Sequence, residues 1–186
     1  TPLCARGKSA AKSKFKVYPS AYANGYAVQV CKGKIKGLKV VIVGDILHSR
    51  VARSNIWGLV KLGAEVRVVG PPTLIPRYIK KAKAKTYYNL EEAIEGADVV
   101  IMLRIQMERQ ESVYFPSLRE YSRFYGLTRE KLKGADKDVT VMHPGPINRG
   151  IELSSDIADD ASSVILDQVS NGIAVRMAMF YLAASA

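Results

Sequence analysis

Short apolar runs alternate with amphipathic stretches from residue 38 to the C-terminus. Apolar runs of this length, bounded by Gly, Pro or Asn, are typical of strands buried in a parallel sheet. The expected strands are 38–43, 65–69, 86–88, 98–103 and 139–142. Apolar residues at helical spacing predict helices at 50–62, 74–84, 90–96 and 128–133, and a long closing helix from Ile165. This alternation predicts an α/β fold, a doubly wound, Rossmann-like parallel sheet of about five strands.

One stretch, 106–125, departs from this pattern because it is polar and charged. A mobile loop flanked by helical turns fits that composition.

The basic charge is concentrated ahead of the first strand. Residues 1–39 hold nine of the 28 Lys and Arg residues and no acid, so the remainder carries 19 basic against 17 acidic side chains despite the net charge of +11. We therefore expect residues 1–32 to form a basic, irregular arm and residues 33–186 to form the α/β domain. A nearly neutral domain argues against a nucleic-acid partner.

Several protein classes are excluded by composition and motifs. No apolar run approaches the roughly 18 residues of a membrane span and no signal peptide is present, so we expect a cytoplasmic protein without membrane association. Cys4 and Cys31 lack metal-ligand spacing and the only histidines are His48 and His143, so we expect no metal site. The glycine-rich motifs for dinucleotides and nucleotide phosphates are also absent.

Three loops follow the carboxyl ends of expected strands, where ligands bind in parallel sheets. In the first loop, Ser49 is placed to cap the next helix and Arg50 falls in its first turn. A cation at the positive end of a helix is unfavourable unless an anion binds there. An ion pair between Arg50 and Asp45 is the structural alternative.

The second loop begins with Arg104, which directly continues an apolar strand, and Gln106 projects to the same side. A guanidinium fork matches a carboxylate, whereas a solvated charge at a strand end is the alternative. Two arginines in one crevice predict a dianionic small ligand. His48 and His143 are the only candidate general bases, and either is as readily a hydrogen-bonded loop histidine.

The third loop holds two prolines around one glycine. Pro144 and Pro146 fix φ and lack an N–H, which leaves nearby carbonyl groups available to an amine. The bond between Gly145 and Pro146 is a candidate cis peptide, although an ordinary proline turn is the alternative.

These loops carry a family resemblance. Residues 43–55, 102–109 and 143–150, with 167–172 in the closing helix, closely resemble the C-terminal, aspartate-binding half of aspartate carbamoyltransferase catalytic chains. The match runs from about Gly33 to the C-terminus. Ornithine enzymes carry His-Cys-Leu-Pro where this chain has His-Pro-Gly-Pro from His143, so the resemblance points to aspartate.

The resemblance implies transfer of a carbamoyl group from carbamoyl phosphate to L-aspartate in pyrimidine synthesis, with no cofactor. It assigns no catalytic side chain with certainty. By motif position, the substrate-binding residues would be Arg50, Arg104, Gln106, Pro144, Gly145 and Pro146. Glu108 and Arg109 would begin a mobile loop whose closure positions the two substrates. The bond before Pro146 would be cis.

The family's other half binds carbamoyl phosphate through Ser-Thr-Arg-Thr and His-Pro-x-Gln motifs, and this sequence contains neither. We therefore expect a partial catalytic chain that forms a homotrimer if the missing domain is supplied, with a regulatory chain as a further candidate partner. Two other functions stay open: a non-catalytic module that binds aspartate or another dianion beside a full-length relative, and a nucleic-acid-binding protein that uses the basic arm.

Overall fold

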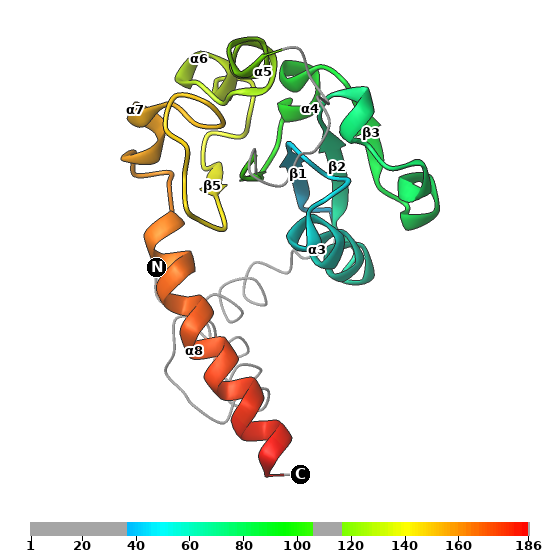
Figure 1. Cartoon of the computed structure of the whole chain (residues 1–186), viewed down its shortest axis with the longest axis vertical. Coiled ribbons are helices and arrows are strands. Elements are labelled where there is room, and N and C mark those ends of the chain that lie inside the picture. Colours follow the sequence, from blue (N-terminus) through cyan, green and yellow to red (C-terminus); the bar gives the residue numbers. More distant parts are fainter. Residues whose placement is uncertain (1–36, 106–116, 186) are drawn as a thin grey trace. The chain divides into compact units, whose positions relative to one another are not determined.

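The computed structural model describes residues 37–105 and 117–185 (Figure 1). The basic arm and the predicted site residues Gln106, Glu108 and Arg109 lie outside the described residues. Leu38–Ile165 form one compact unit, called here the α/β unit, and residues from Leu166 onward belong to a second.

The α/β unit is built on a parallel sheet of five strands in the order β3-β2-β1-β4-β5. The strands are β1 (Lys39–Val43), β2 (Glu65–Val69), β3 (Lys85–Tyr87), β4 (Val99–Met102) and β5 (Thr140–Met142). Each strand lies within one residue of its expected position at either end. The prediction of a doubly wound parallel sheet is confirmed.

The helices cover both faces of this sheet. Those of the α/β unit are α3 (Arg50–Lys61), α4 (Leu90–Ile94), α5 (Leu118–Tyr125), α6 (Arg129–Leu132) and α7 (Ser155–Ala158). The last helix, α8 (Ile165–Ala184), belongs to the second unit from Leu166 onward. Figure 1 shows α3 and α4 on opposite sides of β1 and β2. Side chains cap two of the short helices: Asn89 accepts from the first turn of α4, and Thr128 accepts from the Lys131 N–H in α6.

One prediction of local structure was wrong. Instead of a helix at 74–84, the chain forms two 3₁₀ helices, η1 (Pro72–Leu74) and η2 (Arg77–Ala82). Pro76 lies between them; it lacks an N–H and disfavours a helical conformation at the preceding residue. The described end of the polar stretch 106–125 forms α5, in agreement with the helical turns expected beside the loop, and the Ser117 hydroxyl caps this helix by accepting from the Glu120 N–H at 3.1 Å.

Successive residues of β1 serve two separate hydrophobic cores. Val41 and Val43 pack with α4 on one face, whereas Val40 and Ile42 pack with α3 on the other. Burial on both faces explains why the strands read as continuous apolar runs rather than as an alternating pattern.

Helix α8 begins at a buried residue and continues with exposed apolar side chains. Ile165 at its start is buried, but large apolar side chains farther along are exposed: Leu166, Val169, Ile173, Met177, Met179 and Phe180. None of the helices in the described chain is both long and apolar enough to cross a membrane.

Candidate functional site

Three neighbouring strands carry the three predicted loops. β1, β4 and β5 are adjacent in the sheet, and the Leu103 N–H donates to the Val43 carbonyl at 2.8 Å, which holds the first two strand ends together. The strand order changes direction between β1 and β4, so their carboxyl ends form a topological switch point. The fold therefore brings the loops that follow residues 43, 102 and 142 to one edge of the sheet.

The first loop begins at Gly44, where only glycine fits. Its φ is +125°, and a Cβ added there would lie 3.1 Å from the Tyr121 hydroxyl and 3.2 Å from the Leu103 Cβ. Asp45 follows and is buried. Its carboxylate accepts from the His48 N–H and lies 3.0 Å from Nδ1 of the same histidine. The alternative of an Arg50–Asp45 ion pair is wrong, because Asp45 pairs with His48 instead.

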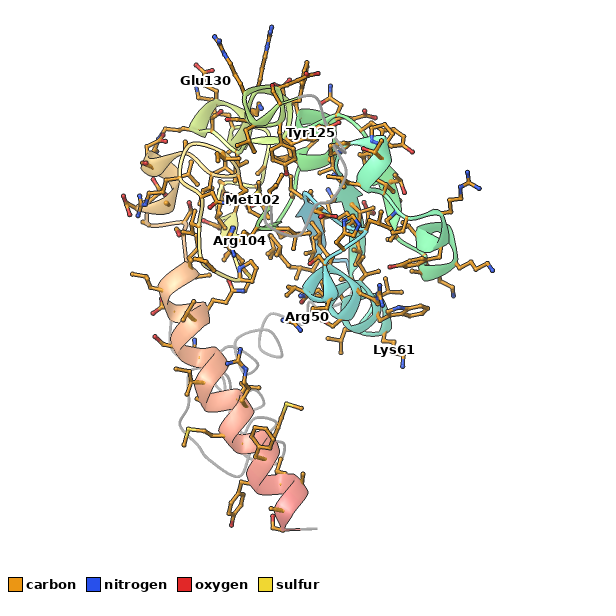
Figure 2. The ribbon with its side chains drawn as sticks, viewed as in Figure 1. Arg50, Lys61, Met102, Arg104, Tyr125 and Glu130 are labelled. Atoms are coloured by element: carbon orange, nitrogen blue, oxygen red, sulfur yellow. The ribbon has the colours of Figure 1, made fainter. Side chains whose placement is uncertain are left out.

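Arg50 is the first residue of α3 and is exposed (Figure 2). The Ser49 hydroxyl accepts from the Ala52 N–H at 3.1 Å, so the predicted N-cap is confirmed. The first turn of α3 contains no acidic residue. Arg50 therefore adds its charge to the positive end of the helix dipole, an arrangement suited to binding an anion.

Arg104 stands two residues beyond β4 and is partly buried (Figure 2). Its charge acts on His143 of the third loop, whose pKa it helps to lower. The two loops also touch directly, because Nδ2 of Asn148 in the third loop donates to the carbonyl of Ile105, the residue after Arg104, at 3.3 Å.

The proline loop has the predicted cis bond between Gly145 and Pro146, and Gly145 adopts a φ of +66°. The Gly145 N–H donates to Nδ1 of His143 at 2.9 Å. His143 is completely buried, and burial together with the Arg104 charge lowers its pKa to about 4. A neutral histidine that accepts a backbone hydrogen bond orders the loop, which makes His143 a poor candidate for a general base.

One buried residue of the site, Glu152, was not predicted from the sequence. It is fully buried, and its Oε1 accepts from the Ile105 N–H at 2.9 Å and from Nδ2 of Asn148 at 2.7 Å. Its Oε2 accepts from the Asn148 N–H at 2.9 Å. Burial raises the pKa of Glu152. The available signal was a single charge between two apolar residues, Ile151 and Leu153, just after the proline loop.

Residues 36–183 match the family described as "Aspartate/ornithine carbamoyltransferase, Asp/Orn binding domain". The chain is 59% identical over 157 residues to the aspartate carbamoyltransferase catalytic subunit of Desulforamulus reducens, which covers 84% of this chain and 50% of the relative. It is 63% identical over 150 residues to the corresponding subunit of Moorella thermoacetica, covering 81% and 49%. The chain thus spans about half the length of the curated relatives it matches.

Solved structures agree on the fold. Ornithine carbamoyltransferase from Pyrococcus furiosus is similar with a TM-score of 0.63 and 27% identity, covering 91% of this chain and 53% of that one. The enzyme from Burkholderia thailandensis E264 has a TM-score of 0.66 at 21% identity, covering 83% and 50%. The matched segment contains all three loops of the described site. The chain therefore belongs to the aspartate/ornithine carbamoyltransferase family and carries its Asp/Orn-binding domain.

Proposed function

We propose that this chain is the aspartate-binding half of an aspartate carbamoyltransferase. The reaction joins carbamoyl phosphate and L-aspartate into N-carbamoyl-L-aspartate and phosphate, the step that begins a pyrimidine ring. The observation that carries the proposal is the placement of Arg50, Arg104 and the cis-proline loop after adjacent strand ends. The identity of about 60% to aspartate carbamoyltransferase catalytic subunits supports it.

Charge favours aspartate over ornithine as the amine substrate. Arg50 and Arg104 add two positive charges to the site, and the first turn of α3 holds no compensating acid. Aspartate brings two carboxylates, which two guanidinium groups can hold bidentately, whereas the side chain of ornithine is itself a cation and would be repelled.

Binding and orientation account for the chemistry we assign to this half. Arg50, Arg104 and Gln106 hold the two carboxylates of aspartate, while carbonyl groups around Pro144 and Gly145, next to the cis bond before Pro146, direct its amino group. The amine nitrogen attacks the carbamoyl carbon, the C–O bond to phosphate breaks, and the proton lost by the nitrogen passes to the departing phosphate. Holding the reactants in this geometry supplies most of the rate, so no protein nucleophile is required.

The segment from residue 106 contributes the remaining contacts in this proposal. Glu108 and Arg109 begin a loop whose closure brings the two substrates together. Residues 33–186 form the aspartate-binding domain and residues 1–32 a separate basic arm. Turnover depends on a carbamoyl-phosphate-binding domain, and the active assembly is a homotrimer that accepts a regulatory chain.

The test is titration of the purified chain with L-aspartate, succinate and L-ornithine by isothermal calorimetry. We expect both dicarboxylates to bind, ornithine not to bind, and Arg104→Ala to weaken dicarboxylate binding about 100-fold, near 2.7 kcal/mol. Arg149→Ala is the matched control, because Arg149 is an exposed arginine whose guanidinium pairs with Asp159. Equal binding of ornithine, or equal losses in both variants, would contradict the proposal.

A second function uses the same two arginines beside the cis-proline loop. A non-catalytic aspartate-binding module would bind dicarboxylates through Arg104 but form no carbamoyl-aspartate. An assay with carbamoyl phosphate, L-aspartate and an added carbamoyl-phosphate domain from a relative separates the two, since only the enzyme half restores turnover.

A further inference from the structure

Glu152 is a buried carboxylate to which the proposed reaction gives no contact with substrate. Its side chain is completely buried, and the hydrogen bonds to its carboxylate come from neutral N–H groups. Removing a carboxylate from water is costly, and hydrogen bonds to neutral donors return only part of that cost. An apolar side chain would fill the same space at lower cost, so packing alone does not explain a glutamate here.

The donors that reach Glu152 come from two different substrate loops. Ile105 directly follows Arg104 at the exit of β4, and its N–H is 2.9 Å from Oε1. Asn148 lies two residues after the cis-proline bond and donates both its side-chain and backbone N–H groups. Nδ2 of Asn148 also approaches the Ile105 carbonyl at 3.3 Å, which closes the connection between the loops.

We propose that Glu152 is a positioning residue of the aspartate site, which fixes the direction of Arg104 relative to the cis-proline loop. This inference rests on the proposed function. The Arg104 guanidinium binds a carboxylate well only in a narrow range of directions. The peptide unit that joins Arg104 to Ile105 carries the N–H bound by Glu152, so this hydrogen bond restrains the backbone from which Arg104 projects. Small displacements of a substrate-positioning group weaken binding and catalysis strongly.

The need for a carboxylate follows from the donor count. Three N–H groups converge on two oxygens, and a carboxylate presents acceptors on both sides. In Glu152→Gln one oxygen becomes an NH₂ group, which faces a donor instead of accepting from it. If the NH₂ group replaces Oε2, the glutamine loses the bond from the Asn148 N–H, and if it replaces Oε1, it loses the bonds from the Ile105 N–H and Asn148 Nδ2. Glu152→Ala loses all three hydrogen bonds.

The experiment combines dicarboxylate affinity with amide hydrogen exchange in the full chain, both measured well below the unfolding temperature. We expect Glu152→Gln to weaken succinate binding about 10-fold and Glu152→Ala about 100-fold. We also expect faster exchange at Ile105, Asn148 or both, with wild-type exchange at Val100 in the core of β4. Asp160→Asn is the matched control, since Asp160 binds the Ser162 N–H and Arg129 but neither substrate loop, and its affinity should stay within twofold.

Wild-type affinity in Glu152→Ala would overturn the inference, as would exchange that rises equally at Val100 and Ile105, which indicates general destabilisation. A wild-type chain that binds no dicarboxylate would reject the proposed function. In that case amide hydrogen exchange in the Glu152 variants still tests whether Glu152 positions the two loops. Faster exchange confined to the two loops supports this role, and unchanged or uniform exchange overturns it.

Discussion

Two buried charges lie in the same α/β unit and are stabilised in opposite ways. Arg67 of β2 donates Nε to the Glu65 carboxylate at 2.8 Å and Nη1 to the carbonyls of Ala93 and Glu95, at the end of α4. Glu152 accepts only from N–H groups of two loops at the carboxyl edge of the sheet. The partners of Arg67 belong to the framework and those of Glu152 to the site. The same physics of burial therefore supports stability in one place and site geometry in the other.

Arg67→Ala should have the largest effect on stability. It leaves the carbonyls of Ala93 and Glu95 without this donor and leaves Glu65 with Lys85 as its remaining partner among the described residues, at a cost of about 3 kcal/mol in the free energy of unfolding. Urea denaturation measures the loss, and succinate affinity should be unchanged. The control is Lys85→Ala, which removes the exposed partner of the same Glu65 and should cost less than about 1 kcal/mol. A matching loss of affinity in Arg67→Ala would remove the distinction between the two buried charges.

His143 should make the carboxyl edge sensitive to acid. Its pKa in the folded chain is about 4, below the usual 6.5, so the unfolded chain binds a proton more readily. The contribution of neutral His143 to the free energy of unfolding should therefore be fully present above pH 6.5. This contribution should be lost as the pH falls from 6.5 to 4, which lowers the free energy of unfolding by up to about 3 kcal/mol. Glu152 contributes with the opposite sign because burial raises its pKa. The measurement is thus the difference in pH slope between wild type and His143→Gln, and equal slopes would refute the assignment.

Gly44→Ala should lower both stability and affinity, since it forces a Cβ at positive φ against Tyr121 and Leu103. We expect a loss of about 2 kcal/mol in unfolding free energy and weaker succinate binding. Gly58→Ala is the control, because Gly58 lies inside α3 and an added Cβ meets no atom within 4 Å. That change should stabilise the chain by about 0.5 kcal/mol. Thermal unfolding should show a lower midpoint temperature for Gly44→Ala and a higher one for Gly58→Ala than for the wild type.

Ser49→Ala should have the smallest effect. Loss of the cap on α3 costs about 1 kcal/mol, and because Arg50 is the next residue, succinate affinity should fall a few-fold. Ser117 caps α5 with the same geometry, its hydroxyl accepting at 3.1 Å. Ser117→Ala should therefore lose similar stability without any change in affinity. Equal affinities in the two variants would mean that the α3 cap does not serve the site.

Local signals explain what the sequence predicted well. Strands and their glycine boundaries, the Ser49 cap and the cis-proline loop all depend on residues close together in the chain. The prediction of a helix at 74–84 was wrong because it followed the spacing of apolar residues and gave too little weight to Pro76, which interrupts helical hydrogen bonding. Glu152 was missed for a different reason. Its key partner, Ile105, is 47 residues away in sequence, and only the packing of β4 beside β5 brings the two together.

The partner of the Asp45 carboxylate could not be predicted from residue spacing either. Asp45 had Arg50 and His48 within reach, and the turn of the loop directs its carboxylate to the backbone and ring of His48. That choice leaves Arg50 available to an anion at the start of α3, which is the feature on which the proposed dicarboxylate site depends.

The edges of the sheet determine how this chain behaves in concentrated solution. β3 has three residues and begins with an exposed lysine, Lys85, and the outer side of β5 is occupied because Val141 exchanges hydrogen bonds with Ser162 and Val164. Neither edge offers a long row of open backbone groups on which a strand from another molecule could add. Aggregation through β-pairing is therefore disfavoured by the α/β unit. Nonspecific hydrophobic contacts between molecules should instead involve the exposed apolar side chains of α8. Polar substitutions in α8 are therefore the first to make for crystallisation.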